Sequence, residues 1–201
     1  MPSTTFRTEA PPPPPPSIPA VNWAPSRPPH EPPIVSTVGP AGAFMVELLV
    51  FNGAPFKDHW AYWVRSQTSP DVGVWIHAIG DVMNGFKFEV KRSHDFRGTA
   101  DVPTKRIPLQ WVDAKWFDEV AMLNNGRYKL DSTPVCGFEA SAYKIKAPGK
   151  TLNAVNEKVP SDGKRITQRN CQTWIVESAD QLVKDCIFSK DVATYLRASK
   201  Q

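Results

Sequence analysis

A cysteine near the start of a predicted helix is the residue of this chain best suited to covalent chemistry. Cys171 follows Asn170, a residue type that favours the N-cap position, and the apolar side chains of Trp174 and Ile175 continue the helical pattern. The positive end of a helix dipole lowers the pKa of a thiol in the first turn. Because the thiolate is the nucleophilic form, we predict that Cys171 is an activated nucleophile.

Two histidines supply the base that such a thiol needs. His59 opens one predicted strand and His77 lies in the next, with a short turn between the strands. Strands joined in this way pair antiparallel, and the two imidazoles could then lie side by side. One ring would accept the proton of Cys171 and the other would fix the tautomer of the first. Each residue alone also fits a packed or surface role, and spacing by itself does not bring the three together.

These residues depend on a domain that we place at residues 42–201. Alternating and β-branched patterns predict strands at 43–51, 58–65, 73–79, 86–91, 109–112 and 135–146. Helical patterns are found at 114–123, after Asp113 as N-cap, and at 150–159, 169–187 and 189–197. Strands followed by helices predict an α+β domain, in which an antiparallel sheet carries the nucleophile-bearing helix on one face.

A proline-rich tail at residues 1–41 precedes this domain. Most of the 21 prolines of the chain lie in the tail, including an unbroken run from Pro11 to Pro16. Proline fixes φ and removes a backbone donor, so we expect a disordered, extended tail. The run Pro11–Pro16 is a candidate ligand for an SH3 or WW groove, and a plain spacer is the alternative.

The charge and apolar patterns exclude two classes of partner. The formal net charge is +4, and the basic residues are dispersed rather than gathered in a stripe, which predicts no nucleic-acid binding. The apolar stretch 43–51 is interrupted by Glu47 and is too short to span a bilayer, which predicts no transmembrane segment. Residues 1–20 lack the apolar run of a secretory signal.

Cysteine usage predicts a cytoplasmic protein without a metal or cofactor. The three cysteines are Cys136, Cys171 and Cys186, an odd number whose spacing fits neither a disulfide framework nor a zinc site. Free thiols persist in a reducing compartment. His94 stands beside Asp95 in what we interpret as a polar loop. A metal site joining His94 with the two other histidines and Cys171 is an alternative, but close ligand pairs are lacking.

The sequence around the three candidate residues resembles a known family. The hexapeptide His-Trp-Ala-Tyr-Trp-Val beginning at His59 resembles the first-strand motif of the lecithin:retinol acyltransferase-like and phospholipid acyltransferase families, which reads approximately His-Trp-Ala-Ile-Tyr-Val. Val-Trp-Ile-His ending at His77 resembles their second-strand motif, and Asn-Cys-Gln around Cys171 resembles their Asn-Cys-Glu-His-Phe helix. The order His, His, Cys is that of the circularly permuted NlpC/P60 papain-like fold. The resemblance covers about residues 55–100 and 150–180.

The resemblance implies a fold and a mechanism. In a permuted papain-like domain, Cys171 would be the nucleophile, His59 the general base and later the general acid, and His77 the residue that orients His59. The thiolate would attack an ester, thioester or amide carbonyl of a lipid, a small acyl donor or a peptide, and an acyl-enzyme would form. Backbone N–H groups at the helix start would hold the oxyanion.

The sequence departs from the family pattern at several positions. Gln172 stands in place of the family's Glu, Thr173 in place of its His, and Trp63 in place of a tyrosine. The stretch 96–148 matches no part of the family. These departures put the family's lipid substrates in doubt for this chain.

Two other functions remain open from the sequence. The chain resembles the permuted deSUMOylase-like class as well, which would make it an isopeptidase or peptidase; that class relies on a Cys–His pair, so His77 favours acyl transfer. The other hypothesis is an adaptor. In that case the domain would keep its fold without catalytic activity, and the chain would act through Pro11–Pro16.

Overall fold

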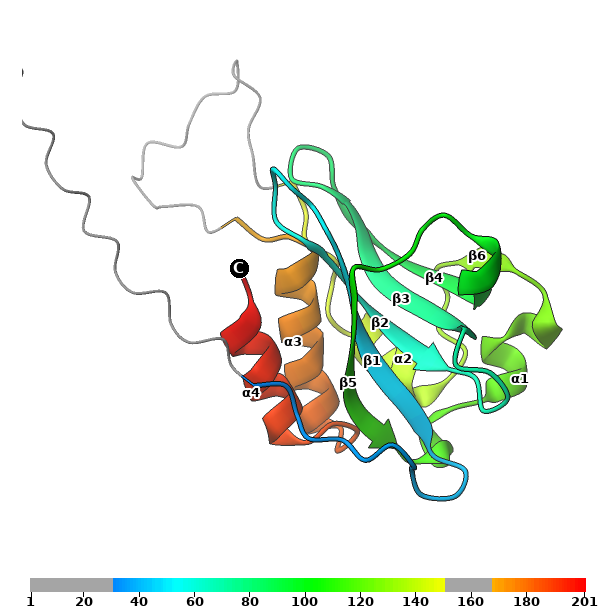
Figure 1. Cartoon of the computed structure of the whole chain (residues 1–201). Coiled ribbons are helices and arrows are strands. Elements are labelled where there is room, and N and C mark those ends of the chain that lie inside the picture. The colour runs from blue at the N-terminus through cyan, green and yellow to red at the C-terminus, as the bar shows by residue number, and fades with distance from the viewer. Residues whose placement is uncertain (1–30, 151–167) are drawn as a thin grey trace, which may run out of the picture.

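A six-stranded antiparallel sheet forms the centre of the computed structural model, which describes residues 31–150 and 168–201 (Figure 1). The strand order is β5-β1-β2-β3-β4-β6, and all neighbouring strands in it are antiparallel. The strands are β1 (Phe44–Phe51), β2 (His59–Arg65), β3 (Val72–Asp81), β4 (Gly85–Asp95), β5 (Lys105–Val112) and β6 (Lys129–Asp131). The predicted α+β class with an antiparallel sheet is confirmed.

Helices pack on one face of this sheet, where α3 contacts β2 and β3 and α4 lies beside α3 (Figure 1). The α-helices are α1 (Glu119–Met122), α2 (Gly137–Tyr143), α3 (Cys171–Lys184) and α4 (Lys190–Ser199). Short 3-10 turns occur at η1 (Phe96–Gly98), η2 (Ala114–Trp116) and η3 (Asn124–Gly126). The predicted terminal helices are confirmed within a few residues at each end.

The alternation of side chains along β2 divides the interior into two cores. Trp60, Tyr62 and Val64 point toward the helices, where the Tyr62 hydroxyl donates to the carbonyl of Ile175 in α3 at 2.8 Å. Ala61 and Trp63 point to the opposite face and form a smaller apolar cluster there. Because successive strand residues face opposite sides, His59 belongs to this second face, and so does His77 in β3.

The connection from β4 to β5 covers part of the second face. Strands β3, β2 and β1 lie between β4 and β5 in the sheet, so the connecting residues 96–104 must cross those strands (Figure 1). The Phe96 ring lies 4.5 Å from that of Trp63, and the amide of Asn52 donates to the Thr104 hydroxyl at 3.1 Å. The first part of the stretch 96–148, which matches no part of the similar family, is therefore this crossing connection.

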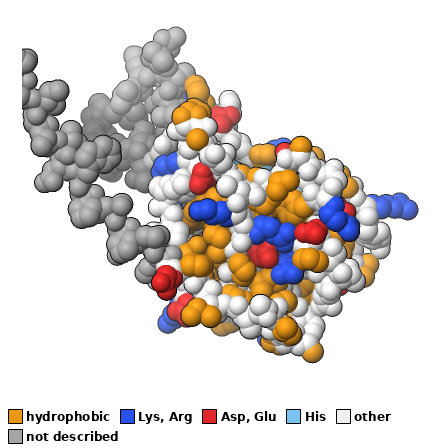
Figure 2. All heavy atoms as spheres, in the orientation of Figure 1, with side chains coloured by type: hydrophobic (Ala, Val, Ile, Leu, Met, Phe, Trp, Pro, Cys, Tyr) orange, Lys and Arg blue, Asp and Glu red, His pale blue; other side chains and the backbone are white. Residues whose placement is uncertain are grey.

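Charges of both signs meet on the face seen in Figure 2, where Lys, Arg, Asp and Glu side chains gather among apolar ones. On the second face of the sheet, Arg106 binds Glu47 at 2.8 Å and Asp71 at 3.2 Å, while Arg65 lies 3.4 Å from Glu47. The cluster is therefore mixed in sign.

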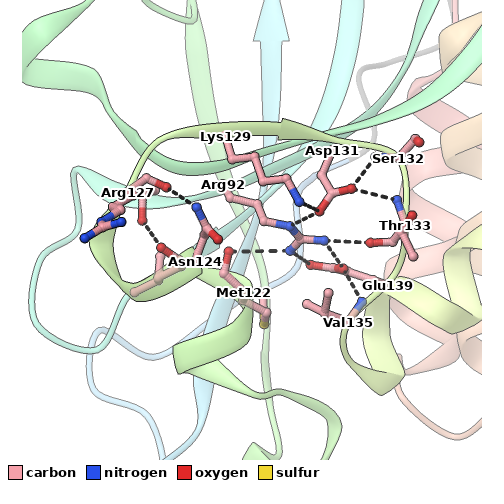
Figure 3. A network of polar contacts seen from close by, with 12 residues as sticks. Arg92, Met122, Asn124, Arg127, Lys129, Asp131, Ser132, Thr133, Val135 and Glu139 are labelled. Carbon is pink, nitrogen blue, oxygen red and sulfur yellow. Dashed lines mark hydrogen bonds and ion pairs between the residues drawn. The ribbon is translucent and has the colours of Figure 1, made fainter.

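A buried ion pair fastens β6 and α2 to the edge of the sheet (Figure 3). Arg92 in β4 donates to both carboxylate oxygens of Glu139 in α2, at 2.9 and 3.0 Å. Its Nε donates to Asp131 at 2.9 Å, and its second terminal nitrogen also donates to the Thr133 carbonyl at 2.8 Å. Arg92 and Glu139 are almost fully buried, so each charge depends on the other for solvation.

Two predicted elements are wrong between residues 113 and 146. The predicted strand at 135–146 is instead the helix α2, because Phe138 and Ala142, four residues apart, both enter the core while Glu139 turns inward to Arg92. The predicted helix after Asp113 is broken at Phe117, which has an extended backbone. Asp113 caps only the short η2, and Asp118 caps α1 through the amide of Ala121.

Other sequence predictions fall outside the described residues. The predicted helix at 150–159 lies almost entirely in residues 151–167, and the run Pro11–Pro16 lies in residues 1–30. Residues 31–41 of the predicted tail contain no helix or strand, and the Trp111 indole donates to the carbonyl of Ser36 at 2.9 Å. Across the part of the chain that the structure describes, no helix is both long and apolar enough to cross a membrane.

Candidate functional site

The two predicted histidines lie in direct contact on the second face of the sheet. His59 Nε2 and His77 Nδ1 are 2.8 Å apart, and the ring planes meet edge to face at 73°. His77 is buried and His59 is partly exposed. The structure therefore brings together the two side chains that the sequence placed on neighbouring antiparallel strands.

The sheet opens where these rings meet. The recorded register of β2 with β3 runs from Tyr62–Ile76 to Arg65–Gly73 and ends before His59 is reached. Continued past Tyr62, this register would set His77 opposite Ala61, so His59 is its diagonal neighbour on the same face. Diagonal neighbours lie within reach of aromatic side chains. The imidazole pair thus bridges the point where the first residues of β2 separate from β3.

The predicted nucleophile lies against the backbone on both sides of His59. Cys171 is the first residue of α3, and Asn170 caps the helix by accepting from the amide of Thr173 at 3.0 Å. The Cys171 sulfur is 3.9 Å from the Asp58 carbonyl oxygen, and the Trp60 amide also points to it. In the described residues, no hydrogen bond joins this sulfur to either imidazole.

Burial sets the protonation states of the three residues. It raises the pKa of the Cys171 thiol, although the amides of Trp60, Gln172 and Cys171 itself act in the opposite direction. The expectation of a lowered pKa is therefore wrong for the free protein, because desolvation outweighs the amides at the helix start. The thiol is neutral at pH 7, so a base must remove its proton during the reaction.

Both histidines are neutral at pH 7 for the same reason. Burial lowers the pKa of His59 to about 4, with the positive charge of Lys91 acting in the same direction. Burial lowers the pKa of His77 to about 2, followed by the charges of His59, Lys91 and Lys87. A neutral imidazole carries one proton, so each ring donates through one nitrogen and accepts through the other.

A carboxylate that the sequence analysis did not single out lies next to the two histidines. Glu89 in β4 is the register partner of His77, and its Oε1 lies 3.4 Å from His77 Nε2. Glu89 is almost buried and also lies 3.4 Å from the exposed amine of Lys87. The alternation of residues 86–91 predicted a half-buried strand, but only the β3–β4 register shows that Glu89 faces His77.

Gln172, the departure from the family's Glu, has a structural explanation. Its amide nitrogen donates to the Asp58 carbonyl at 2.9 Å and to the Gln201 side chain at 3.1 Å. Its amide oxygen accepts from the Gln201 backbone at 2.9 Å. A glutamate could not make the first two bonds. Gln172 therefore holds the peptide that precedes His59 next to the first turn of α3.

The third histidine of the described residues, His94, and the other two cysteines do not join the site. His94 lies buried in β4 rather than in a polar loop, with its ring 5.3 Å from that of Trp75 and 4.8 Å from that of Phe96. Cys136 precedes α2, and burial raises the pKa of its thiol to about 12. Cys186 is exposed at the end of α3. Among the described residues, no group of three or more His, Cys, Asp or Glu side chains could hold a metal ion.

A surface hollow of about 310 Å³ lies elsewhere in the domain. It is lined by residues 39, 40 and 42–45, residues 65–70 and Trp111, at the end of β2 opposite His59. It therefore shares no residue with the cluster of Cys171 and the two histidines.

Residues 46–189 of the chain match DUF6540, a family of unknown function. The match covers well over half of the chain, so the chain belongs to this family. His59, His77, Glu89 and Cys171 all lie inside the matched range. No curated protein and no solved structure matches the chain.

Proposed function

We propose that the chain is a thiol enzyme of the permuted papain-like class, which transfers or hydrolyses acyl groups through a thioester on Cys171. The observation that carries the proposal is the 2.8 Å contact of His59 Nε2 with His77 Nδ1, beside a cysteine whose sulfur meets the backbone next to His59. With Nε2 engaged by His77, the other nitrogen of His59, Nδ1, is the one left to accept a proton from the thiol.

The protonation states define how the first half of the reaction proceeds. The sulfur of Cys171 attacks the carbonyl carbon of the acyl donor, and its proton passes to His59 as the carbon–sulfur bond forms. Amide groups at the start of α3 would stabilise the oxyanion, since the first N–H groups of a helix have no intrahelical partner. When the intermediate collapses, the bond to the leaving group breaks and His59 returns the proton to that group.

The second half restores the free enzyme. Water or another acceptor loses a proton to His59 and attacks the thioester carbonyl, and the sulfur of Cys171 leaves and regains the proton from His59. In both halves His77 keeps the His59 ring in one orientation. The acceptor decides whether the outcome is hydrolysis or transfer.

Mass spectrometry of the intact chain tests this proposal. The full chain would be incubated with a short-chain acyl thioester, a long-chain oxygen ester and an isopeptide-linked peptide, and the acylated residue would be mapped. We expect an acyl adduct on Cys171 with at least one donor, lost in Cys171→Ser and retained in Cys186→Ser. No adduct with any donor, or equal labelling of Cys186, would overturn the proposal.

A further inference from the structure

Three side chains from three adjacent strands form a continuous row that ends at a carboxylate. His59 in β2 contacts His77 in β3 at 2.8 Å, and His77 contacts Glu89 in β4 at 3.4 Å. The row is enclosed, because the His77 side chain is 2% exposed and that of Glu89 is 12% exposed. In the described residues, the only hydrogen-bond acceptor placed at His77 Nε2 is Glu89.

The carboxylate dictates where the protons of both rings must lie. An ionised carboxylate only accepts hydrogen bonds, so His77 must carry its proton on Nε2 to bond Glu89. His77 Nδ1 is then a bare acceptor, and the 2.8 Å contact requires His59 to donate through Nε2–H. Since neutral His59 has one proton, its Nδ1 is left unprotonated.

We infer that Glu89 is a positioning residue, which selects through His77 the tautomer in which His59 Nδ1 is free to act as a base. The inference rests on the proposed function, because the free nitrogen matters only if it accepts the proton of Cys171. Without this acceptor, the His77 Nε2–H would be buried and unpaired, which favours the reverse arrangement. His77 would then donate through Nδ1, His59 would accept at Nε2, and the proton of His59 would occupy Nδ1.

Nitrogen-15 NMR of the histidine rings tests the inference without reference to activity. Long-range ¹H–¹⁵N spectra of the full chain at pH 7 distinguish a protonated ring nitrogen from a bare one. We expect protonated Nε2 and bare Nδ1 in both His59 and His77. A bare Nε2 in His77 of the unmodified protein would overturn the inference directly, and this result requires no variant to fold.

Glu89→Leu removes the acceptor from His77 Nε2, whereas a glutamine would keep one in its amide oxygen. We expect the signals of both rings to move toward the opposite tautomer, and acylation of Cys171 to slow by about 10-fold or more because the proton of His59 then occupies Nδ1. The control is Lys87→Gln, which removes the exposed cation beside Glu89 and leaves the carboxylate in place; it should leave both tautomers unchanged.

The outcomes separate this inference from the proposed function. If the rings have the expected tautomers and Glu89→Leu shifts them, but Cys171 is never acylated, Glu89 orients the rings and the proposed chemistry is wrong. If Cys171 is acylated and Glu89→Leu changes neither the tautomers nor the rate, the proposed function holds and the role of Glu89 is wrong.

Discussion

His59 and His77 lie in contact through Nε2 and Nδ1 at 2.8 Å, at a place where the recorded pairing of their two strands has already ended. Their contact is therefore made by the side chains rather than by the backbone ladder. The contact lies next to the start of α3, where the Cys171 sulfur meets the Asp58 carbonyl oxygen at 3.9 Å.

Replacement of His77 should slow acylation of Cys171. In His77→Ala the His59 ring loses the partner that fixes its tautomer, and we expect the single-turnover acylation rate to fall by about 10²-fold, in the range for general-base catalysis. His94→Ala is the control, because His94 is also buried on this face yet has no contact with His59. An equal loss of rate in both variants would indicate a general effect on folding instead.

The histidine pair should also make the folded state sensitive to acid. The pKa of His59 is lowered to about 4 and that of His77 to about 2, from an ordinary value of 6.5. Between pH 6.5 and about 4, the unfolded chain binds protons at these rings and the folded chain does not. The free energy of unfolding therefore falls with falling pH in this window, by up to about 1.4 kcal/mol per pH unit for each ring.

Urea unfolding at pH 7, 6 and 5 measures this slope. Replacing His77 by Asn removes one of the two rings, so the slope between pH 6 and 5 should decrease by about 1 kcal/mol per unit. A variant whose unfolding free energy falls as steeply as that of the original chain would show that His77 does not titrate below its ordinary range in the folded state.

Gln172→Glu should destabilise the start of α3 even though it restores the residue found in the similar family. The substitution removes the donor to the Asp58 carbonyl and leaves an acceptor facing that partly buried oxygen. We expect a loss of about 2 kcal/mol in the free energy of unfolding. Gln67→Glu, which removes an exposed amide donor to the Gly42 carbonyl, should cost about 0.5 kcal/mol or less. Similar losses in both would contradict a specific role for Gln172.

The buried ion pair of Arg92 with Glu139 predicts a strong stability effect far from the candidate site. Arg92→Met leaves the fully buried Glu139 carboxylate without a cation and should cost about 3–5 kcal/mol by urea unfolding. Lys129→Ala removes an exposed amine 3.0 Å from Asp131 and should change the free energy by less than about 1 kcal/mol. A small effect of Arg92→Met would mean that water solvates Glu139.

Local patterns predicted the strands better than the connecting elements. The strand from His59 and the strand around His77 follow from alternation and turn residues, and both formed as predicted. The strand predicted at 135–146 failed because its apolar residues also fit a helix, and the buried partner of Glu139 is Arg92, 47 residues away. Sequence periodicity contains no information on such a pairing.

At the candidate site too, features that depend on neighbouring residues in the sequence were predicted, whereas features that depend on long-range contacts were not. The two histidines could be placed on neighbouring strands from the sequence, because a short turn joins those strands. The contact of Glu89 with His77 depends on the register of β3 with β4, which the sequence did not fix. The raised pKa of Cys171 depends on burial, which outweighs the amides of Trp60, Gln172 and Cys171 and which no helix-dipole argument includes.

The rate at which Cys171 is acylated with and without its base tests the central claim most directly. The full chain and His59→Ala would be mixed at pH 7 with an acyl thioester in single-turnover experiments, and the adduct on Cys171 would be quantified by mass spectrometry against the exposed Cys186. The account predicts that His59→Ala acylates Cys171 about 10²–10⁴-fold more slowly while Cys186 is unchanged. Equal rates for Cys171 in the two proteins would contradict it.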